Sequence, residues 1–279
     1  DEFIDNVYKA VKAEGDDKIV YGEVWEDASN KESYGIRRRY LLGNQLDSVM
    51  NYPFKEAILN YVKSSDYKAF QDSVLTILNN YPKPALDCLM NFISTHDTER
   101  ALTRLGGEET GFHDREWQSR QRLSEREYPY AVLLLRCAMV LQFFLPGVPC
   151  VYYGDEAGLE GYKDPFNRRT YPWKKENTLL IEHVRQLAEI RRSSSVFAGG
   201  GFKFIRLDEQ FCVFARTDEK AKKAAVIFLN KSTVGFTFVP SEISEKLSNP
   251  DIKGRFKAGE NGEITVSPFD YAVVFYDMK

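Results

Sequence analysis

The sequence lacks the features that mark two large classes of protein. Basic residues are not in excess, because 38 Lys and Arg stand against 41 Asp and Glu with the two signs interleaved, and the net charge is −3. This balance excludes the basic stripe of a nucleic-acid binder. No apolar run is long enough to span a membrane, because the longest, around residues 131–153, is interrupted by Arg136, Gln142, Pro146 and Pro149.

Cysteine is scarce as well. The four cysteines are scattered without the spacing of metal ligands, so they do not indicate a metal centre: Cys88, Cys137, Cys150 and Cys212. Three of them lie in apolar runs, and we expect buried free thiols. Aromatic residues, in contrast, make up 14% of the chain. Such richness fits a large core, and it also fits a surface on which flat rings stack against sugars.

Hydrophobic spacing predicts an alternation of strands and helices over the first two thirds of the chain. Apolar residues three and four positions apart indicate helices over residues 2–13, 54–63, 67–80, 128–145 and 179–191. Short apolar runs indicate strands at residues 18–21, 45–50, 86–93 and 148–153. This alternation predicts βα units and a parallel sheet, and the continuous apolar runs indicate that both faces of the sheet are buried.

The pattern changes near residues 193–200. From there to Lys279 no long helical pattern occurs, and Gly, Pro, Asn and Asp separate short apolar runs at residues 211–215, 224–230, 235–240 and 271–276. We therefore expect an α/β domain over residues 1–195, followed by a small antiparallel β-sandwich domain over residues 196–279.

Polar side chains follow each predicted strand of the α/β domain. In parallel α/β folds the functional groups gather where strands end and loops begin. The residues at these places are Glu23 after the first strand, Asn51 and Tyr52 after the second, His96 and Asp97 after the third, and the segment 154–169 after the fourth.

Glu23 lies in the stretch "YGEVWEDASN", directly after an apolar run and two residues before Trp25. It is either a solvated acid just past the end of a strand or a general acid. A carboxyl group packed against an indole is partly desolvated, which raises its pKa and keeps it protonated near neutrality. Such an environment would suit the general acid.

The pair His96-Asp97 also has two interpretations. Asp97 is either the N-cap of a helix that begins near Thr98, or an ionised carboxylate beside an imidazole that donates a hydrogen bond to substrate. A second His-Asp pair, at residues 113–114, has no strand before it and lies in a polar stretch, so we expect a solvated loop there. His183 falls inside a helical pattern and is expected at the surface or at an interface.

The segment after the fourth strand combines Asp164 and Arg168 with aromatic neighbours, namely Tyr162, Tyr171 and Trp173. The Asp-Pro and Asn-Arg-Arg sequences of this segment either make a turn and a salt bridge or recognise the hydroxyl groups of a sugar. A carboxylate and a guanidinium can each hold two vicinal hydroxyls.

The order of these motifs is more specific than any one of them. The stretches "GEVW", "DSVMNY", "NFISTHDTER" and "PGVPCVYYGDEAGLEGYKDPFNRRTYPW" stand at the ends of successive predicted strands. Over residues 1–175 this order resembles the α-amylase superfamily of glycoside hydrolases, and the β-domain is similar to the sandwich that follows the barrel in that family. "LDSVMNYPF" and "LEGYKDPFNRRTYPW" look most like the branch of neopullulanases, cyclomaltodextrinases and maltogenic amylases.

The resemblance implies a (β/α)8 TIM barrel that hydrolyses the α-glucosidic bonds of starch-like oligo- and polysaccharides with retention. Glu23 matches the family's general acid/base, and Asp97 matches its third carboxylate, which stabilises the transition state. The expected substrate-binding residues are His96, Trp25, Asn51, Tyr52, Asp164 and Arg168. We expect an α-glucan as the partner, and no nucleic acid, membrane, cofactor or metal. The calcium sites of some family members lie mostly in a region that would precede residue 1.

The sequence departs from the family at one point. The family's nucleophilic aspartate lies on the strand before that of Glu23, and retention needs it about 5–5.5 Å from the acid. Residues 1–22 contain one helix and no earlier strand. We therefore expect the C-terminal half of a barrel and no turnover by this chain alone. We also expect either self-association through the exposed barrel edges or a rearrangement that covers them.

Two other interpretations remain open. In the first, the chain is a non-catalytic carbohydrate-binding or interaction domain, in which Tyr162, Trp173 and neighbouring rings bind glucans. In the second, it is a complete open α/β domain with four strands and an unrelated role. The absence of a glycine-rich phosphate loop after any strand speaks against the second.

Overall fold

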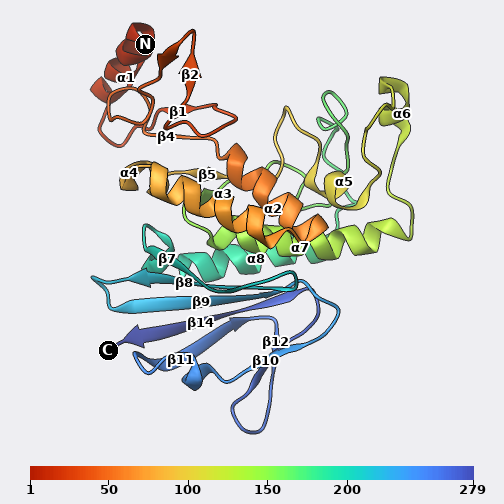
Figure 1. Cartoon of the computed structure of the whole chain (residues 1–279). Helices are drawn as coiled ribbons and strands as arrows, with labels where there is room; N and C mark the ends of the chain where they lie inside the picture. The colour runs from red at the N-terminus through yellow and green to blue at the C-terminus, as the bar shows by residue number, and fades with distance from the viewer.

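The computed structural model describes all residues 1–279 and consists of two regions, one above the other in Figure 1. The upper region contains the α-helices and a row of short parallel strands. The lower region contains two antiparallel β-sheets. Helices α7 and α8 lie at the junction, where they contact strands of the larger sheet.

The helices of the upper region are α1 Glu2–Ala13, α2 Tyr52–Ser64, α3 Tyr67–Asn80, α4 Lys83–Asp87, α5 Ala101–Gly106, α6 Arg115–Arg120, α7 Glu127–Phe144 and α8 Thr178–Arg192. The five long helices coincide with the predicted ones to within two residues at each end. Helices α4, α5 and α6 have five or six residues each, too few for a hydrophobic period to predict.

The parallel strands are β1 Tyr21–Gly22, β4 Ser48–Val49, β5 Met90–Asn91 and β6 Val148–Pro149. β1 pairs with β4, a bridge between Met50 and Met90 joins β4 to β5, and β5 pairs with β6. Each strand overlaps a predicted one but is shorter. Residues 86–87, predicted as strand, belong to α4, because Pro84 in the first helical turn favours a helix start there.

The row of parallel strands has two open ends. β1 and β6 each pair with a single neighbour. Near β1, helix α1 has no buried residue, and Phe3 and Ile19 are 78% and 51% exposed. At the other end Val148 of β6 is 45% exposed. A hairpin of β2 Glu32–Ser33 and β3 Ile36–Arg37 projects beside α1 (Figure 1).

The lower region contains the strands β7 Gly201–Leu207, β8 Phe211–Asp218, β9 Lys223–Asn230, β10 Phe236–Phe238, β11 Leu247–Gly254, β12 Phe256–Ala258, β13 Ile264–Val266 and β14 Asp270–Met278. They form a five-stranded sheet in the order β11-β14-β9-β8-β7 and a three-stranded sheet in the order β10-β13-β12. All the pairs are antiparallel. Side chains of both sheets form one apolar cluster, in which Phe228 stacks on Phe238 at 3.8 Å.

The largest core joins the two regions. It contains 46 buried residues and includes side chains of α2, α3 and α7 together with Phe214, Ile227 and Val273 of the five-stranded sheet. Helix α7 is apolar on all sides, as expected for a helix that is covered all round. The division predicted between residues 195 and 196 falls in a short 3-10 helix, Ser195–Phe197, where the larger sheet is about to begin.

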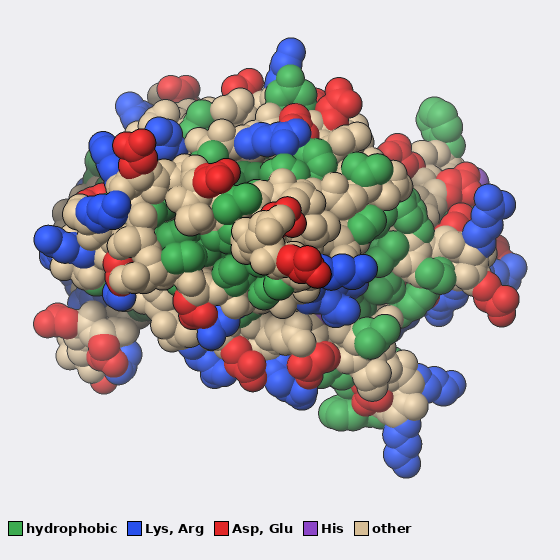
Figure 2. Space-filling model, turned by 90° about the horizontal axis from the view of Figure 1, so that it is seen from below, with side chains coloured by type: hydrophobic (Ala, Val, Ile, Leu, Met, Phe, Trp, Pro, Cys, Tyr) green, Lys and Arg blue, Asp and Glu red, His purple; other side chains and the backbone are tan.

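The surface agrees with the balanced composition. On the face seen in Figure 2, acidic and basic side chains are interspersed, and no region of one sign stands out. None of the helices is both long and apolar enough to cross a membrane. All four cysteines are free thiols; Cys137 and Cys212 are buried as predicted, whereas Cys88 is half-buried and Cys150 is exposed.

Candidate active site

Three of the predicted site residues meet at the C-terminal ends of the parallel strands. Glu23 is the first residue after β1, and His96 and Asp97 lie in the loop that follows β5. One carboxylate oxygen of Glu23, one of Asp97 and a ring nitrogen of His96 all lie within 4.8 Å of one another. Parallel strands bring these loops together because their C-terminal ends share one edge of the sheet.

The Glu23 carboxylate is held on one side only. Its Oε1 atom accepts hydrogen bonds from the Tyr52 hydroxyl at 2.7 Å and from the Trp25 indole N–H at 3.2 Å. The two rings stack at 4.4 Å. Glu23 itself is exposed, so the predicted desolvation by the indole is wrong: Trp25 lies beside the carboxylate and donates to it without covering it.

Tyr52 and Asn51 are buried, and neither is placed as a ligand contact. Tyr52 is 2% exposed, and burial and its bond to Glu23 both raise the pKa of its hydroxyl, which therefore remains a donor. Asn51 is 1% exposed; its Oδ1 caps α2 by accepting from the Phe54 N–H, and its Nδ2 donates to Asn91 at 2.8 Å. The fold already uses the polar atoms of both residues, and their contact with substrate stays a prediction.

Asp97 is not a helix cap. The N-cap position of α5 is taken by Arg100, without a side-chain cap, and Asp97 lies three residues earlier. Its Oδ2 lies 3.3 Å from Nε2 of His96, and its backbone N–H donates to Oγ1 of Thr95 at 3.1 Å. Because the carboxylate is 37% exposed, it remains accessible to a ligand.

Arg168 connects two predicted site carboxylates. Its Nε lies 2.6 Å from Oδ1 of Asp164, and its Nη2 lies 3.2 Å from Oδ1 of Asp97. The salt bridge that we considered as the alternative to sugar recognition is therefore present, and the same guanidinium also reaches Asp97. Asp164 and Arg168 are both about half exposed, at 51% and 45%.

The aromatic neighbours differ in their accessibility. Tyr162 is 4% exposed and donates from its hydroxyl to the carbonyl of Glu108, so it offers no face to a sugar. Trp173, which contacts Tyr171, is 76% exposed, and Trp25 is 52% exposed. Of the predicted sugar-binding rings, the two tryptophans are thus the ones with free faces.

A groove of about 340 Å³ opens beside this cluster. Trp25 and Asp97 form part of its wall, together with Lys55, Arg104 and Lys163. Apart from Thr98, the side chains that line the groove beside the exposed indole are charged, and such groups can form hydrogen bonds with the hydroxyl groups of a sugar. Glu23, His96 and Asp97 could also hold a cation, and the absence of a metal remains a prediction.

The other histidines lie elsewhere. The pair at 113–114 is exposed as predicted, but it starts helix α6: Asp114 accepts from the Trp117 N–H at 2.8 Å, and His113 stacks on Trp117. His183 is 1% exposed, and its Nε2 lies 3.1 Å from the carbonyl oxygen of Arg136. Of the two predicted positions for His183, surface or interface, the structure excludes the surface, because α8 turns this face toward α7 and β14.

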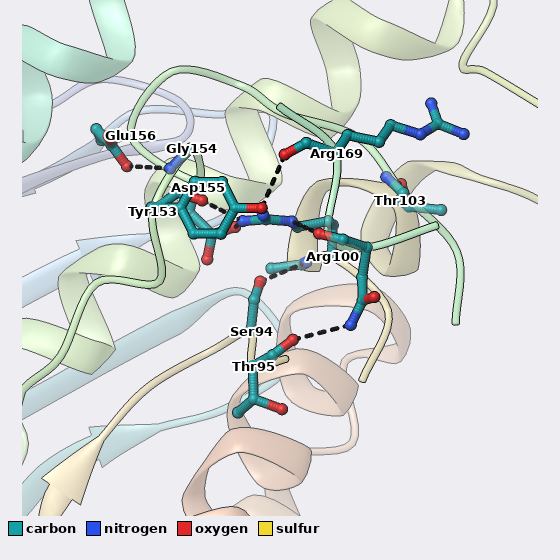
Figure 3. A network of polar contacts seen from close by, with 12 residues as sticks. Ser94, Thr95, Arg100, Thr103, Tyr153, Gly154, Asp155, Glu156 and Arg169 are labelled. Atoms are coloured by element: carbon teal, nitrogen blue, oxygen red, sulfur yellow. Dashed lines mark hydrogen bonds and ion pairs between the residues drawn. The ribbon is translucent and has the colours of Figure 1, made fainter. Parts of the chain in front are cut away.

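Sequence reasoning missed a buried polar network behind the site (Figure 3). Arg100 and Asp155 are almost fully buried and form an ion pair at 3.1 Å. Burial raises the pKa of the Asp155 carboxyl to about 6, and the Arg100 charge opposes that rise. Both residues stand in the quoted motifs, "HDTER" and "GDEAG", but nothing in a local pattern distinguishes a buried arginine from a solvated one.

Comparisons with known sequences agree on one family. A family model described as the catalytic domain of alpha amylase matches residues 1–195. A cyclomaltodextrinase of Geobacillus thermopakistaniensis (strain MAS1) is 30% identical over 278 residues, which cover 97% of this chain and 42% of the relative. Neopullulanase 2 of Thermoactinomyces vulgaris is 32% identical over 211 residues, which cover 74% of this chain and 31% of the relative.

Solved structures agree at the level of fold. The ligand-free cyclic α-maltosyl-(1→6)-maltose hydrolase from Arthrobacter globiformis matches with a TM-score of 0.76 and 24% identity, over 98% of this chain and 53% of that one. An α-amylase from Geobacillus thermoleovorans, complexed with acarbose, matches with a TM-score of 0.75 and 20% identity, over 100% of this chain and 57% of that one. The chain spans about half the length of these enzymes.

Proposed function

Since the chain belongs to the α-amylase family of glycoside hydrolases, we propose that it forms part of the active site of an enzyme that hydrolyses α-glucosidic bonds with retention. The observation that carries this proposal is the convergence of Glu23, His96 and Asp97 within 4.8 Å at the ends of β1 and β5. The names of the relatives, a cyclomaltodextrinase and a neopullulanase, favour starch-like oligosaccharides as the substrate and the neopullulanase-like branch of the family.

Glu23 is the general acid/base of this proposal. Tyr52 and Trp25 both donate to its Oε1, which fixes the orientation of the carboxyl group. The second oxygen is not engaged by the protein and the residue is exposed, so this oxygen can deliver a proton to a glycosidic oxygen. Trp25 offers the sugar next to the broken bond an indole face.

Asp97 is the carboxylate that opposes the positive charge of the oxocarbenium-like transition state. His96 lies beside it and binds the reacting sugar. Arg168 and Asp164 lie on the other side of Asp97 and bind a further sugar, because a guanidinium and a carboxylate match pairs of hydroxyl groups.

The fold supports a division of the chain into part of a catalytic barrel and a C-terminal β-domain. The strands β1, β4, β5 and β6 with their helices correspond in our proposal to the C-terminal half of a (β/α)8 barrel over residues 1–195. The two antiparallel sheets correspond to a β-sandwich over residues 196–279. The α-amylase family combines a TIM barrel with a C-terminal sheet domain.

The retaining mechanism needs a nucleophile that we assign to no residue of this chain. A retaining glycosidase needs a second carboxylate about 5–5.5 Å from the acid, across the sugar from it. Glu23 and Asp97 are the only carboxylates of the residues 1–279 that gather with a histidine in one cluster, and Asp97 already has the third-carboxylate role. We propose that residues 1–279 alone bind glucan without hydrolysing it.

The test compares binding and turnover in two proteins. Isothermal titration calorimetry with maltohexaose and a reducing-sugar assay are run on residues 1–279 and on the enzyme that contains them. We expect glucan binding by both and hydrolysis by the enzyme alone. Hydrolysis by residues 1–279 at enzyme-like rates would overturn the assignment of the nucleophile, and the absence of hydrolysis by the enzyme would overturn the proposed activity.

A non-catalytic carbohydrate-binding domain is the second candidate, favoured by the exposed faces of Trp25 and Trp173. It predicts that Trp173→Ala abolishes maltohexaose binding while Glu23→Gln changes nothing measurable. The catalytic proposal predicts the reverse for hydrolysis, since Glu23→Gln stops turnover and Trp173→Ala changes the affinity.

A further inference from the structure

A buried amide lies behind the loop that carries His96 and Asp97. Asn167 is 0% exposed and belongs to the loop after β6, far from residue 97 in sequence. Its Nδ2 atom lies 3.1, 2.7 and 2.8 Å from the carbonyl oxygens of Thr95, His96 and Thr98. One side chain thus holds three carbonyl groups of a four-residue stretch.

This position requires a donor. The amide NH2 has two hydrogens, so the three carbonyl oxygens share them, and at least one hydrogen has two acceptors. The Oδ1 atom of Asn167 has no partner. Exchanging the two ends of the amide would place Oδ1 against three carbonyl oxygens, which repel it. An aspartate here would do the same with a full negative charge.

The loop that carries Asn167 is anchored in turn by Arg100, which donates from Nε to the Asn167 carbonyl at 2.8 Å. The other end of the guanidinium donates to the carbonyl of Tyr153 and to Asp155 (Figure 3). The loop is also tightly folded, since a Cβ at Gly161 would lie 2.2 Å from the carbonyl oxygen of Phe166. The amide therefore projects from a rigid support.

The neighbouring residue acts on the side chain of the same loop. Arg168 donates from Nε to the carbonyl of His96 at 3.0 Å and from Nη2 to the Asp97 carboxylate at 3.2 Å. Asn167 thus holds the main chain of residues 95–98, while Arg168 holds the carboxylate that this main chain carries. The loop also has restraints of its own: the Asp97 N–H donates to Oγ1 of Thr95, the Thr95 N–H donates to Oγ1 of Thr98, and the two threonine hydroxyls lie 3.3 Å apart.

We propose that Asn167 is a positioning residue, whose buried amide fixes residues 95–98 so that Asp97 and His96 stay in contact with each other and near Glu23. The catalytic relevance of this position rests on the proposed function. Because Arg168 follows directly, the same support also sets the distance between Asp97 and the sugar contacts at Asp164. A sugar bound at Asp164 and Arg168 thereby influences the position of the Asp97 carboxylate, which stabilises the transition state in the proposed mechanism.

The test uses the histidine ring resonances of residues 1–279 by NMR. The chain has three histidines, and only His96 touches the loop in question, so His113 and His183 serve as internal references. Asn167→Ala removes the donors without adding charge, and Asn167→Asp adds a charge that faces the carbonyl groups. Asn44→Asp, at an exposed asparagine, is the matched control for the change of charge.

We expect both Asn167 variants to shift the His96 resonance and leave the other two in place, whereas Asn44→Asp shifts none. In a chain with the native Asn167, Asp97→Asn also shifts the His96 resonance, because Oδ2 of Asp97 lies 3.3 Å from Nε2 of His96. In the Asn167→Asp background this second shift falls to less than about one third, since the contact is loosened.

Two results would overturn the proposal. Unchanged His96 resonances in both Asn167 variants would mean that the loop holds itself. If both variants shifted the resonances of all three histidines, Asn167 would support the whole fold and not this loop in particular. Maltohexaose titration of the unaltered chain is measured in parallel: its failure counts against the proposed function and leaves the outcome for His96 unaffected.

Discussion

At the scale of single residues, the carboxylates of Glu23 and Asp97 are oriented by different kinds of side chain, aromatic donors for Glu23 and an arginine for Asp97. Glu23 is oriented by the rings of its own surroundings, the buried Tyr52 and the exposed Trp25. Asp97 is oriented by Arg168, which comes from a distant part of the chain. Losing either support would misdirect a carboxylate without removing it, so the supports and the carboxylates can be tested separately.

The first prediction concerns Glu23→Gln in the enzyme that contains these residues. The amide keeps the shape of the side chain but cannot deliver a proton, so kcat should fall about 10³-fold, while maltooligosaccharide binding stays within about threefold. A reducing-sugar assay and calorimetry measure the two. Hydrolysis within about tenfold of the unaltered enzyme would remove Glu23 from the acid role.

The second prediction compares the two His-Asp pairs. Asp97→Asn should lower kcat about 10²- to 10³-fold, because a charge that opposes the cationic transition state is lost. Asp114→Asn should be almost silent, because asparagine caps helix α6 about as well as aspartate does. A large loss of kcat for Asp114→Asn, together with an unchanged kcat for Asp97→Asn, would mean that we assigned the active site to the wrong loop.

The outcome for individual residues shows how far local pattern can lead. The position after a strand was enough to predict the meeting of Glu23, His96 and Asp97, because parallel strands end at one edge. The same rule selected Asn51 without revealing its structural role, since an asparagine between a strand and a helix is also a favourable N-cap, and Asn51 caps α2. Asn167 was undetectable, because its three acceptors are main-chain carbonyls distant in sequence.

At the scale of elements, helix α7 shows how the fold satisfies the end of a buried helix. The last carbonyl groups of a helix have no partner within it. Arg191 of α8 donates to the carbonyls of Phe143 and Gly147, and Arg216 of β8 donates to that of Phe144. Burial lowers the pKa of Arg191 to about 10 and that of Arg216 to about 9, so both remain charged at neutrality and complement the helix dipole.

The third prediction follows from this arrangement. Arg216 also donates to the partly buried carbonyls of Gly200 and Gly201, so Arg216→Met removes the arginine donor from one buried and two partly buried acceptors. The free energy of unfolding in urea should fall by about 2–4 kcal/mol. Arg206→Met, at a half-exposed arginine of β7, should cost less than about 1 kcal/mol. Equal losses for the two variants would contradict this account.

The fourth prediction concerns the interface of α7 and α8. Burial, followed by the charge of Arg136, lowers the pKa of His183 to about 3. Between this value and about 6.5 the unfolded chain binds a proton that the folded chain does not, so stability falls as the pH falls through that window. The effect is absent above about pH 7.

His183→Gln isolates this contribution, because other groups titrate in the same range; the buried Asp155, for example, has a pKa raised to about 6 and acts in the opposite direction. The variant should lose about 3 kcal/mol less stability between pH 7 and pH 4 than the unaltered chain, as measured by urea unfolding at both pH values. Parallel losses in the two proteins would show that the imidazole is protonated in the folded state.

A helix or strand could be predicted from the sequence where a continuous pattern of apolar residues ran along its whole length. The five long helices met that condition. The strand β7 did not, because its residues alternate between exposed and half-buried, and β11 contains Pro250 and lies at the edge of its sheet. The short parallel strands were predicted too long, since an apolar run continues into the loops that pack beneath the site.

At the scale of the whole molecule, two features of the surface stand together: open strand edges and uncovered apolar side chains. β1 and β6 each lack one neighbour, and Phe3 and Ile19 are exposed near β1. Unpaired strand edges can pair with further strands, and exposed apolar patches tend to become buried in contacts with other proteins. We therefore expect this region to associate with another polypeptide or with another copy of the chain.

The fifth prediction is that residues 1–279, purified alone, have a light-scattering mass above that of the 32.2 kDa monomer. Phe3→Lys combined with Ile19→Lys should shift the mass toward the monomer, because two charges oppose pairing at that end. Leu179→Lys, at an equally exposed leucine of α8, should change nothing. A monodisperse monomer for the unaltered chain would refute the expectation that these edges associate.

The core that α7 shares with the five-stranded sheet has a consequence for the order of synthesis. The ribosome releases residues 127–144 well before residues 211–274, yet the two pack in one cluster. During that interval the part of this apolar helix that packs on the sheet is exposed to solvent. Nascent protein is most prone to aggregate in such a state. Slow translation beyond residue 200 should therefore reduce the yield of folded protein more than slow translation before α7 does.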